Sequence, residues 1–255
     1  MRLNIKMRNI NDLQISFFSR IINKKPEIKN LDFLFSKLKD NNSKFHVEKA
    51  RQLYNSSKEE YRNFRLNNLP AVDVRCVYSN GKADNNGERI YNGLVFLDFD
   101  KVENCTLLKL KLIELPYIIA CWTSTSGKGV HAIAYTENYI KDDTTYYNSF
   151  SQISLSCLSE LGIIPDERAA NSTQQTFISF DRNFHLKTNF EPFPIDINFK
   201  KEPNKNRLNN LESKQYTILD LDFYIKKFEN FYEKIYITTK NTNLPVLFQE
   251  QLKYN

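Results

Sequence analysis

The sequence predicts an α+β protein with a largely antiparallel sheet. Segments rich in β-branched and aromatic residues alternate with segments whose apolar residues recur at helical spacing. Two expected strands, at 72–78 and 90–98, are joined by a segment rich in Asn, Gly and Asp, which favours a hairpin and therefore antiparallel neighbours. With 41% hydrophobic and 26% charged residues, the chain has the composition of a globular protein.

The first seventy residues are expected to form a short strand within 1–10 and then three helices. A helix opens at 30–32, because apolar residues recur after it at helical spacing, namely Leu31, Leu34, Phe35 and Leu38. Two more helices are expected at 47–54 and 57–66, the second capped by Ser57. Arg62 and Arg65 make this last helix basic, and we interpret them as charges on a solvated helix face.

The remaining elements follow from turn signals and apolar runs. Pro116 ends one expected helix, and Gly162 with Pro165 closes a longer one. In chain order, these elements are a helix at 106–115, strands at 117–122 and 130–135, a helix at 141–161 and a strand at 177–180. The expected result is a sheet accompanied by helices.

The composition changes beyond Pro194. Residues 200–214 are polar and basic, with Pro203 and four asparagines, and this predicts a linker. Two short amphipathic helices are expected after it, near 220–234 and 245–253. The formal net charge of +6 and the pI of about 8.9 are compatible with a polyanionic partner.

Cysteine spacing and hydropathy exclude several classes of protein. The four cysteines, Cys76, Cys105, Cys121 and Cys157, are scattered and form no CxxC pair, so neither a zinc site nor a disulfide framework is expected. No window approaches ~20 consecutive apolar residues, which argues against a membrane span. The amino terminus lacks the apolar core of a signal peptide, so a cytoplasmic protein is expected.

The apolar run that begins at Leu94 ends in two carboxylates, Asp98 and Asp100. Because residues two apart in a strand share a face, both acids are expected to project together. Placing them at the end of a buried strand is unfavourable unless a positive charge lies between them, and a divalent cation prefers such oxygen ligands. The alternative is a pair of acids that caps the next helix or faces solvent.

Three further features follow in the chain. A loop of Ser, Thr, Gly and Lys spans 124–129, His131 begins the next strand, and Asp181 ends a later one. Carboxylates can hold two metal ions, and a Gly-flanked loop supplies N–H groups for phosphate oxygens. The order and spacing of these features, rather than any one of them, point to a nucleoside triphosphate site. Gly-Lys-Gly is not a Walker loop, because its spacing differs.

This order of motifs resembles the archaeo-eukaryotic primase superfamily, and within it the small primase-polymerases of bacteria, phages and mobile elements. The motifs that carry the resemblance are Leu97-Asp98-Phe99-Asp100, Ser126-Gly127-Lys128-Gly129-Val130-His131 and Phe180-Asp181. Leu69-Pro70-Ala71 and the residues just before Asp181 also look like that family. The resemblance covers 69–193 well, the first seventy residues loosely and the last sixty not at all.

The resemblance implies a template-dependent DNA primase or polymerase that transfers a nucleotide from an NTP or dNTP to a 3′-hydroxyl or an initiating nucleotide. In it, Asp98, Asp100 and Asp181 hold two Mg²⁺ or Mn²⁺ ions. The triphosphate-binding residues it implies are Ser126, Gly127, Lys128, Gly129 and His131, of which His131 is also counted as catalytic. Implied partners are single-stranded DNA template and primer, nucleoside triphosphates, and a helicase or a CRISPR- or defence-associated protein, with no membrane.

The resemblance also implies a domain organisation. Residues 1–198 form the catalytic core, made of an N-terminal αβ unit (1–68) and an RRM-like antiparallel sheet that carries the motifs (69–198). Residues 199–255 form a basic linker and accessory helices. One departure concerns Gln174, where relatives tend to carry Arg, because Gln cannot supply the charged fork of Arg.

Two alternatives remain from the residues. Asp98-Phe99-Asp100-Lys101-Val102 fits the DxDx[TV] element of haloacid-dehalogenase-type phosphatases, in which Asp98 is the nucleophile and Asp100 the general acid. That fold needs a parallel sheet and a later pair of acids, whereas 72–98 predicts a hairpin and Asp181 is a single acid. The second alternative is a replication-associated DNA-binding module with a degenerate site.

Overall fold

The computed structural model describes residues 12–81, 83, 88–171 and 174–199. All of them belong to one compact unit. The expected strand within 1–10, the linker at 200–214 and the two helices at 220–234 and 245–253 lie outside the described residues. The described part is a mixed α+β structure with antiparallel sheets and five α-helices, as the sequence predicts in its coarse form.

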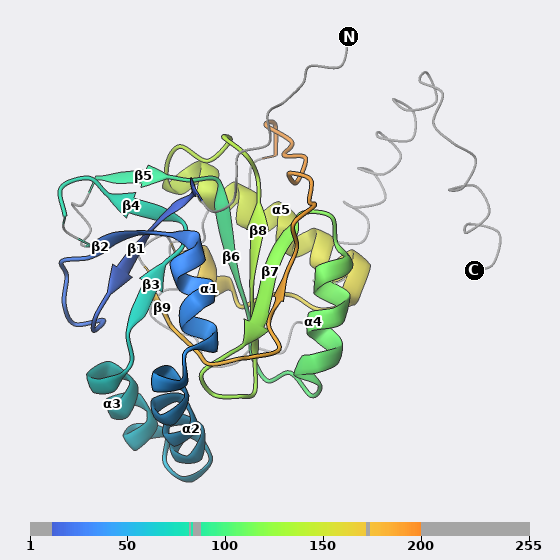
Figure 1. Cartoon of the computed structure of the whole chain (residues 1–255). Coiled ribbons are helices and arrows are strands. Elements are labelled where there is room, and N and C mark those ends of the chain that lie inside the picture. Colours follow the sequence, from blue (N-terminus) through green and yellow to red (C-terminus); the bar gives the residue numbers. More distant parts are fainter. Residues whose placement is uncertain (1–11, 82, 84–87, 172–173, 200–255) are drawn as a thin grey trace, which may run out of the picture. The chain divides into compact units, whose positions relative to one another are not determined.

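The larger strands form a four-stranded sheet in the order β10-β7-β8-β6, and every neighbouring pair in it is antiparallel. Its members are β6 (Leu94–Phe99), β7 (Ile118–Thr123), β8 (Val130–Tyr135) and β10 (His185–Leu186). Nearly all side chains of β6, β7 and β8 are buried, as their continuous apolar runs predict. This sheet is the scaffold on which the candidate site lies (Figure 1).

A second four-stranded sheet joins the beginning of the described chain to later segments. Its order is β2-β1-β3-β9, with β1 (Gln14–Phe18), β2 (Glu27–Asn30), β3 (Ala71–Asp73) and β9 (Thr176–Phe177). The strands β4 (Cys76–Tyr78) and β5 (Arg89–Tyr91) form a separate hairpin. Because β1 pairs with β3, strands on both sides of the expected boundary at 68 share one sheet.

The helices agree closely with the sequence. They are α1 (Leu31–Lys39), α2 (Asn41–Ser56), α3 (Lys58–Asn68), α4 (Cys105–Glu114) and α5 (Asp143–Leu161). The Ser57 side chain accepts a hydrogen bond from Glu60 N, which confirms it as the N-cap of α3. Gly162 ends α5 in the left-handed conformation. Figure 1 shows α2 and α3 side by side and α5 crossing behind β6–β8.

Two expected strands are each broken by a turn. Between β3 and β4, the Asp73 carboxylate accepts hydrogen bonds from the Arg75 backbone and guanidinium, which bends the chain. Between β5 and β6, Gly93 has a positive φ, and Asn92 Oδ1 accepts from Leu94 N. The hairpin expected between 72–78 and 90–98 is therefore only β4–β5, and β6 pairs with β8 instead.

The strand expected at 177–180 is also shorter, since β9 ends at Phe177. The backbone beyond it pairs with helices rather than with a sheet: Asp181 N donates to Leu38 O, and Arg51 Nη2 donates to Phe180 O. Asp181 thus follows an irregular segment packed against α1 and α2, and it does not end a strand of the β6–β8 sheet.

Candidate functional site

Strand register places three polar side chains in one row. Asp98 on β6 lies opposite His131 on β8, and His131 lies opposite Trp122 on β7. Directly opposed residues of antiparallel strands share a face of the sheet. His131 Nε2 lies 3.4 Å from Asp98 Oδ1, and the rings of His131 and Trp122 meet edge to face at 5.7 Å. The predicted association of Asp98 with His131 is therefore present in the structure.

This row contains buried polar atoms without hydrogen-bond partners. They are Asp98 Oδ1, His131 Nδ1 and Trp122 Nε1. His131 and Trp122 are 6% and 0% exposed, so solvent reaches them little. Buried polar groups are normally paired, and an unpaired one costs about 1–3 kcal/mol. A polar or charged ligand that binds here could pair with these atoms and remove that cost.

The opposite face of the same strands is covered by α4. Cys121 Sγ, one residue from Trp122 on β7, contacts the carbonyl of Lys109 on α4 at 3.4 Å. Because successive side chains of a strand alternate between faces, Asp98 and His131 lie on the face away from that contact. On their own face, Phe96 packs edge to face with His131 at 5.1 Å.

The two acids of the DxD motif are held differently. Burial disfavours the charge on Asp98, but the charge of His131, followed by those of Arg168 and Arg65, outweighs it, so the pKa of Asp98 is lowered. Burial raises the pKa of Asp100, and the neighbouring charges of Asp98 and Asp166 raise it further. Mutual repulsion between these acids is the electrostatic condition that a bound cation relieves.

Asp166 is an acid that the sequence reasoning missed. It precedes the short 3-10 helix η2 (Glu167–Ala170), and its backbone N donates to Asp98 O at 2.7 Å along the edge of β6. Its side chain shares Arg168 with Asp100, since Arg168 Nη2 lies 3.2 Å from Asp100 Oδ2 and also contacts Asp166 Oδ2. One guanidinium thus lies between two carboxylates, next to the Asp98–His131 pair. The only signal in the sequence was an acid directly after Pro165.

The structure does not bring Asp181 to Asp98 and Asp100. Asp181 Oδ2 accepts from Lys109 Nζ at 2.6 Å and from Thr123 N at 2.8 Å, and Oδ1 accepts from Asn183 N. Thr123 lies on β7, and β8 separates β7 from β6. With neighbouring strands about 4.8 Å apart, the strand of Thr123, which binds Asp181, lies on the order of 10 Å from the strand of Asp98. The oxygens of Asp181 are occupied by donors of its own protein.

The loop at 124–129 joins β7 to β8 and lies beside Asp100. Gly129 packs so closely against β6 that a Cβ there would lie 2.6 Å from Phe99 O and 3.5 Å from Asp100 Oδ1. Within the loop, Gly127 N donates to Ser124 O and Lys128 N to Ser126 Oγ. Those two N–H groups, expected to bind phosphate, are therefore used by the turn itself. Lys128 is exposed, and its backbone carbonyl accepts a hydrogen bond from Val102 N, two residues after Asp100.

Two arginines from the N-terminal helices also reach this region. Arg51 Nη2 donates to Ser124 O, which ties α2 to the loop. The Arg65 guanidinium lies over the rings of Tyr61 and Phe177, at 4.1 and 4.8 Å from their centroids. The hydroxyls of Tyr61 and Thr125 are 3.1 Å apart, which joins α3 to the same loop. Arg65 is therefore not on a solvated helix face, contrary to the sequence interpretation.

Oxygen ligands suited to a hard divalent cation are present, but they do not converge. In the described ranges, no three His, Cys, Asp or Glu side chains lie close enough together, as they stand, to hold a metal ion. Arg168 occupies the space between Asp100 and Asp166 instead. Asp98, Asp100 and Asp166 offer carboxylate oxygens, the type of ligand that Mg²⁺ and Mn²⁺ prefer, and one of these oxygens is buried without a hydrogen bond.

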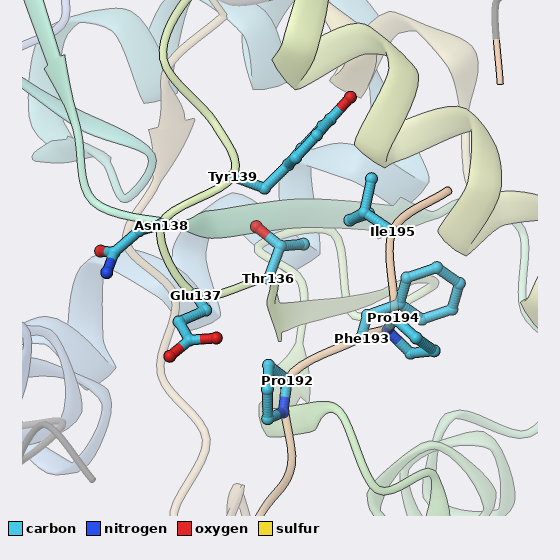
Figure 2. Close-up of a pocket in the computed structure, with 8 residues that line it drawn as sticks. All are labelled: Thr136, Glu137, Asn138, Tyr139, Pro192, Phe193, Pro194 and Ile195. Atoms are coloured by element: carbon cyan, nitrogen blue, oxygen red, sulfur yellow. The ribbon is translucent and has the colours of Figure 1, made fainter. Parts of the chain in front are cut away.

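A separate pocket of about 530 Å³ lies beyond the far end of β8 (Figure 2). It is formed by residues 136–139 and 192–195, which contribute mostly aromatic, proline and aliphatic surface. Thr136 is five residues along the chain from His131, so the pocket lies about 17 Å from the acids. It is not part of the candidate site.

Comparison with known proteins gives one match. The family model described as BT4734-like, N-terminal domain matches residues 66–185. The matched segment contains Asp98, Asp100, the loop at 124–129, His131, Asp166 and Asp181. No curated protein and no solved structure matches the chain. Over the described residues, no helix is both long and apolar enough to cross a membrane.

Proposed function

We propose that this protein is a template-dependent nucleotidyltransferase of the archaeo-eukaryotic primase type, which synthesises or extends primers on single-stranded DNA. One observation carries the proposal: Asp98 and Asp100, with Asp166 beside them, lie next to His131 and the Ser-Gly-Lys-Gly loop on adjacent strands. The sheet that holds these residues is then the catalytic half of a primase core.

Asp98, Asp100 and Asp166 are the residues that would hold Mg²⁺ or Mn²⁺. A bound cation of this kind lowers the pKa of an attacking 3′-hydroxyl and stabilises the charge on the leaving pyrophosphate. Asp166 takes the place that the motif order gave to Asp181, because Asp166 is next to the DxD pair and Asp181 is paired with Lys109. In this proposal Arg168 moves away from the carboxylates when the cation binds.

The chain's own cations would bind and orient the triphosphate. Lys128 extends from the loop next to Asp100 as a point charge, and Ser126 contributes a hydroxyl. His131 is fixed between Phe96 and Trp122, so its ring can donate a hydrogen bond to a phosphate oxygen without losing rotamer freedom on binding. Fixed donors of this kind stabilise charge that develops in the transition state.

The first alternative, a haloacid-dehalogenase-type phosphatase, has less support. It requires strands and helices alternating around a parallel sheet, whereas β6 pairs with β8 in antiparallel register over six residue pairs. The second alternative, a DNA-binding module with a degenerate site, does not explain the buried unpaired oxygen of Asp98 beside His131.

The test is a synthesis assay with Asp98→Ala. Wild-type chain, single-stranded DNA with or without primer, each class of nucleotide, and Mg²⁺ or Mn²⁺ are expected to yield labelled product. The Asp98→Ala variant is expected to yield none while binding DNA normally, because it lacks a carboxylate that holds the cation. Full activity of the variant would refute this role. DNA binding without synthesis by the wild type would favour the binding module, and phosphate release from small phosphoesters the phosphatase.

A further inference from the structure

Arg65 is a fixed cation that no described side chain neutralises. It lies on α3, its side chain makes neither a hydrogen bond nor an ion pair with any residue in the described ranges, and its Nε is buried without a partner. Exposed arginines have water as a partner, but a buried donor without one is unfavourable. The protein therefore maintains an arginine here at a cost in stability.

The surroundings of Arg65 hold its guanidinium in one plane. The group lies over Tyr61 at 4.1 Å and over Phe177 at 4.8 Å, so aromatic rings cover it while its N–H groups remain in the plane at its edge. Tyr61 is in turn in hydrogen-bond contact with Thr125 of the loop. A planar fork held in this way is pre-organised for a planar or tetrahedral oxyanion.

The contacts of Tyr61 place the group beside the loop at 124–129. The guanidinium lies over the Tyr61 ring, and the Tyr61 hydroxyl is 3.1 Å from that of Thr125 in the loop. The other end of this loop packs against Phe99 and Asp100 at Gly129, and within the described residues Arg65 forms no ion pair with either acid of the DxD motif. A ligand that neutralises both the carboxylates and Arg65 must bring a cation to the acids and an anion to the guanidinium. A nucleoside triphosphate with its divalent cation has this chemistry.

We infer that Arg65, whose guanidinium lies over the rings of Tyr61 and Phe177, binds a phosphate of the incoming nucleoside triphosphate. The inference rests on the proposed function and assigns Arg65 to the nucleotide rather than to the template. In this inference, the contact between α3 and the loop positions the arginine, since Tyr61 joins Arg65 to the loop that carries Lys128. The guanidinium supplies a charged fork that Gln174 cannot, the backbone carbonyl of Gln174 being bound by Arg75 instead.

The experiment measures binding of labelled nucleoside triphosphate, with Mg²⁺ and without template, to the full chain and three variants. Arg65→Gln is expected to weaken nucleotide affinity about 10- to 100-fold, the usual loss for a charged hydrogen bond. Arg65→Lys, which keeps the charge but loses the fork, is expected to fall between. Arg62→Gln is the matched control, because Arg62 is exposed on the same helix, and it is expected to bind as the wild type does.

The affinity of the same proteins for single-stranded DNA shows whether Arg65 binds the nucleotide or the template. We expect this affinity to be the same for Arg65→Gln and Arg62→Gln. Equal nucleotide affinity of these two variants would overturn the inference, and so would a loss confined to DNA binding. Melting curves identify a variant that fails to fold. If Arg65→Gln does not fold, the nucleotide affinity of Arg65→Lys tests the inference in its place. If the wild-type chain binds no nucleoside triphosphate, the proposed function fails together with the inference. If the wild type binds it and Arg65→Gln binds it equally well, only the inference on Arg65 fails.

Discussion

The Asp181 carboxylate is nearly buried and holds a buried ammonium group. Its side chain is 9% exposed and that of Lys109 is 4% exposed, with 2.6 Å between Oδ2 and Nζ. Burial disfavours the charge on Asp181, but the hydrogen bonds from Lys109 and Thr123 N outweigh it and lower its pKa. Removing one member of such a pair leaves a buried charge without compensation.

We therefore predict that Asp181→Asn destabilises the protein by about 3 kcal/mol at neutral pH. Because the folded-state pKa lies below that of an unfolded Asp, about 3.9, the contribution is complete above that pH and is lost as pH falls through the folded-state value. Denaturant unfolding at several pH values checks this. The difference between wild type and variant should be constant down to about pH 4 and shrink below it. Adding Lys109→Met should restore part of the stability.

For Asp166 we predict a small effect of substitution on stability and a large effect on synthesis. Its side chain is 22% exposed and pairs with the exposed Arg168, so Asp166→Asn is expected to change the free energy of unfolding by about 1 kcal/mol or less. Synthesis, however, should fall at least about 100-fold, because a carboxylate proposed to hold the cation is lost. Primer extension by Asp166→Asn and Asp181→Asn at equal folded concentration is the measurement. If activity is lost in Asp181→Asn but kept in Asp166→Asn, Asp181 rather than Asp166 is the third carboxylate that holds the cation.

These two acids show which part of the site the sequence can predict. Asp98 and Asp100 follow from strand periodicity, and the register then places His131 opposite Asp98. The position of Asp166 depends on a tertiary contact, the hydrogen bond from its backbone to the edge of β6. No local pattern encodes such a contact, and the order of motifs points instead to Asp181, which ends a later apolar run.

At the scale of elements, the loop at 124–129 is fitted to the end of β6. We predict that Gly129→Ala separates the two, because its Cβ would lie 2.6 Å from the backbone oxygen of Phe99 and 3.1 Å from Ser124 Oγ. The expected cost is about 1–3 kcal/mol, with a loss of synthesis because Asp100 follows Phe99 directly. Gly81→Ala is the control. It introduces backbone strain at positive φ but no contact within 4 Å, so it should lower stability without affecting synthesis.

The helices were predictable and several strands were not, for a physical reason. Each helix carries its own signals, such as the Ser57 cap and the Gly162 terminus, within a few residues. Strand limits depend on distant partners. The run at 72–78 is rich in β-branched and aromatic residues, yet Asp73 binds the Arg75 guanidinium and turns the chain between two sheets. Propensity alone cannot reveal such a buried ion pair.

At the scale of the whole molecule, the net charge of +6 is not evenly distributed. Part of it lies in residues 200–214, which include Lys201, Lys205 and Lys214. Phosphate contacts by such residues release counterions, so affinity for single strands falls with salt in proportion to the number of contacts. In the proposed function, the described core supplies the nucleotide site, and this basic segment is a candidate for the template.

Changing Lys201, Lys205 and Lys214 together to Glu is therefore expected to weaken single-stranded DNA binding and to reduce its salt slope by about 2, since each lost contact contributes about 0.7. Nucleotide affinity should not change, because Arg65, Lys128 and His131 are untouched. Titrations of labelled DNA at several salt concentrations, beside nucleotide binding, measure both. An unchanged salt slope would remove the segment from the DNA interface, whereas a parallel loss of nucleotide affinity would mean that template and nucleotide share one set of cations.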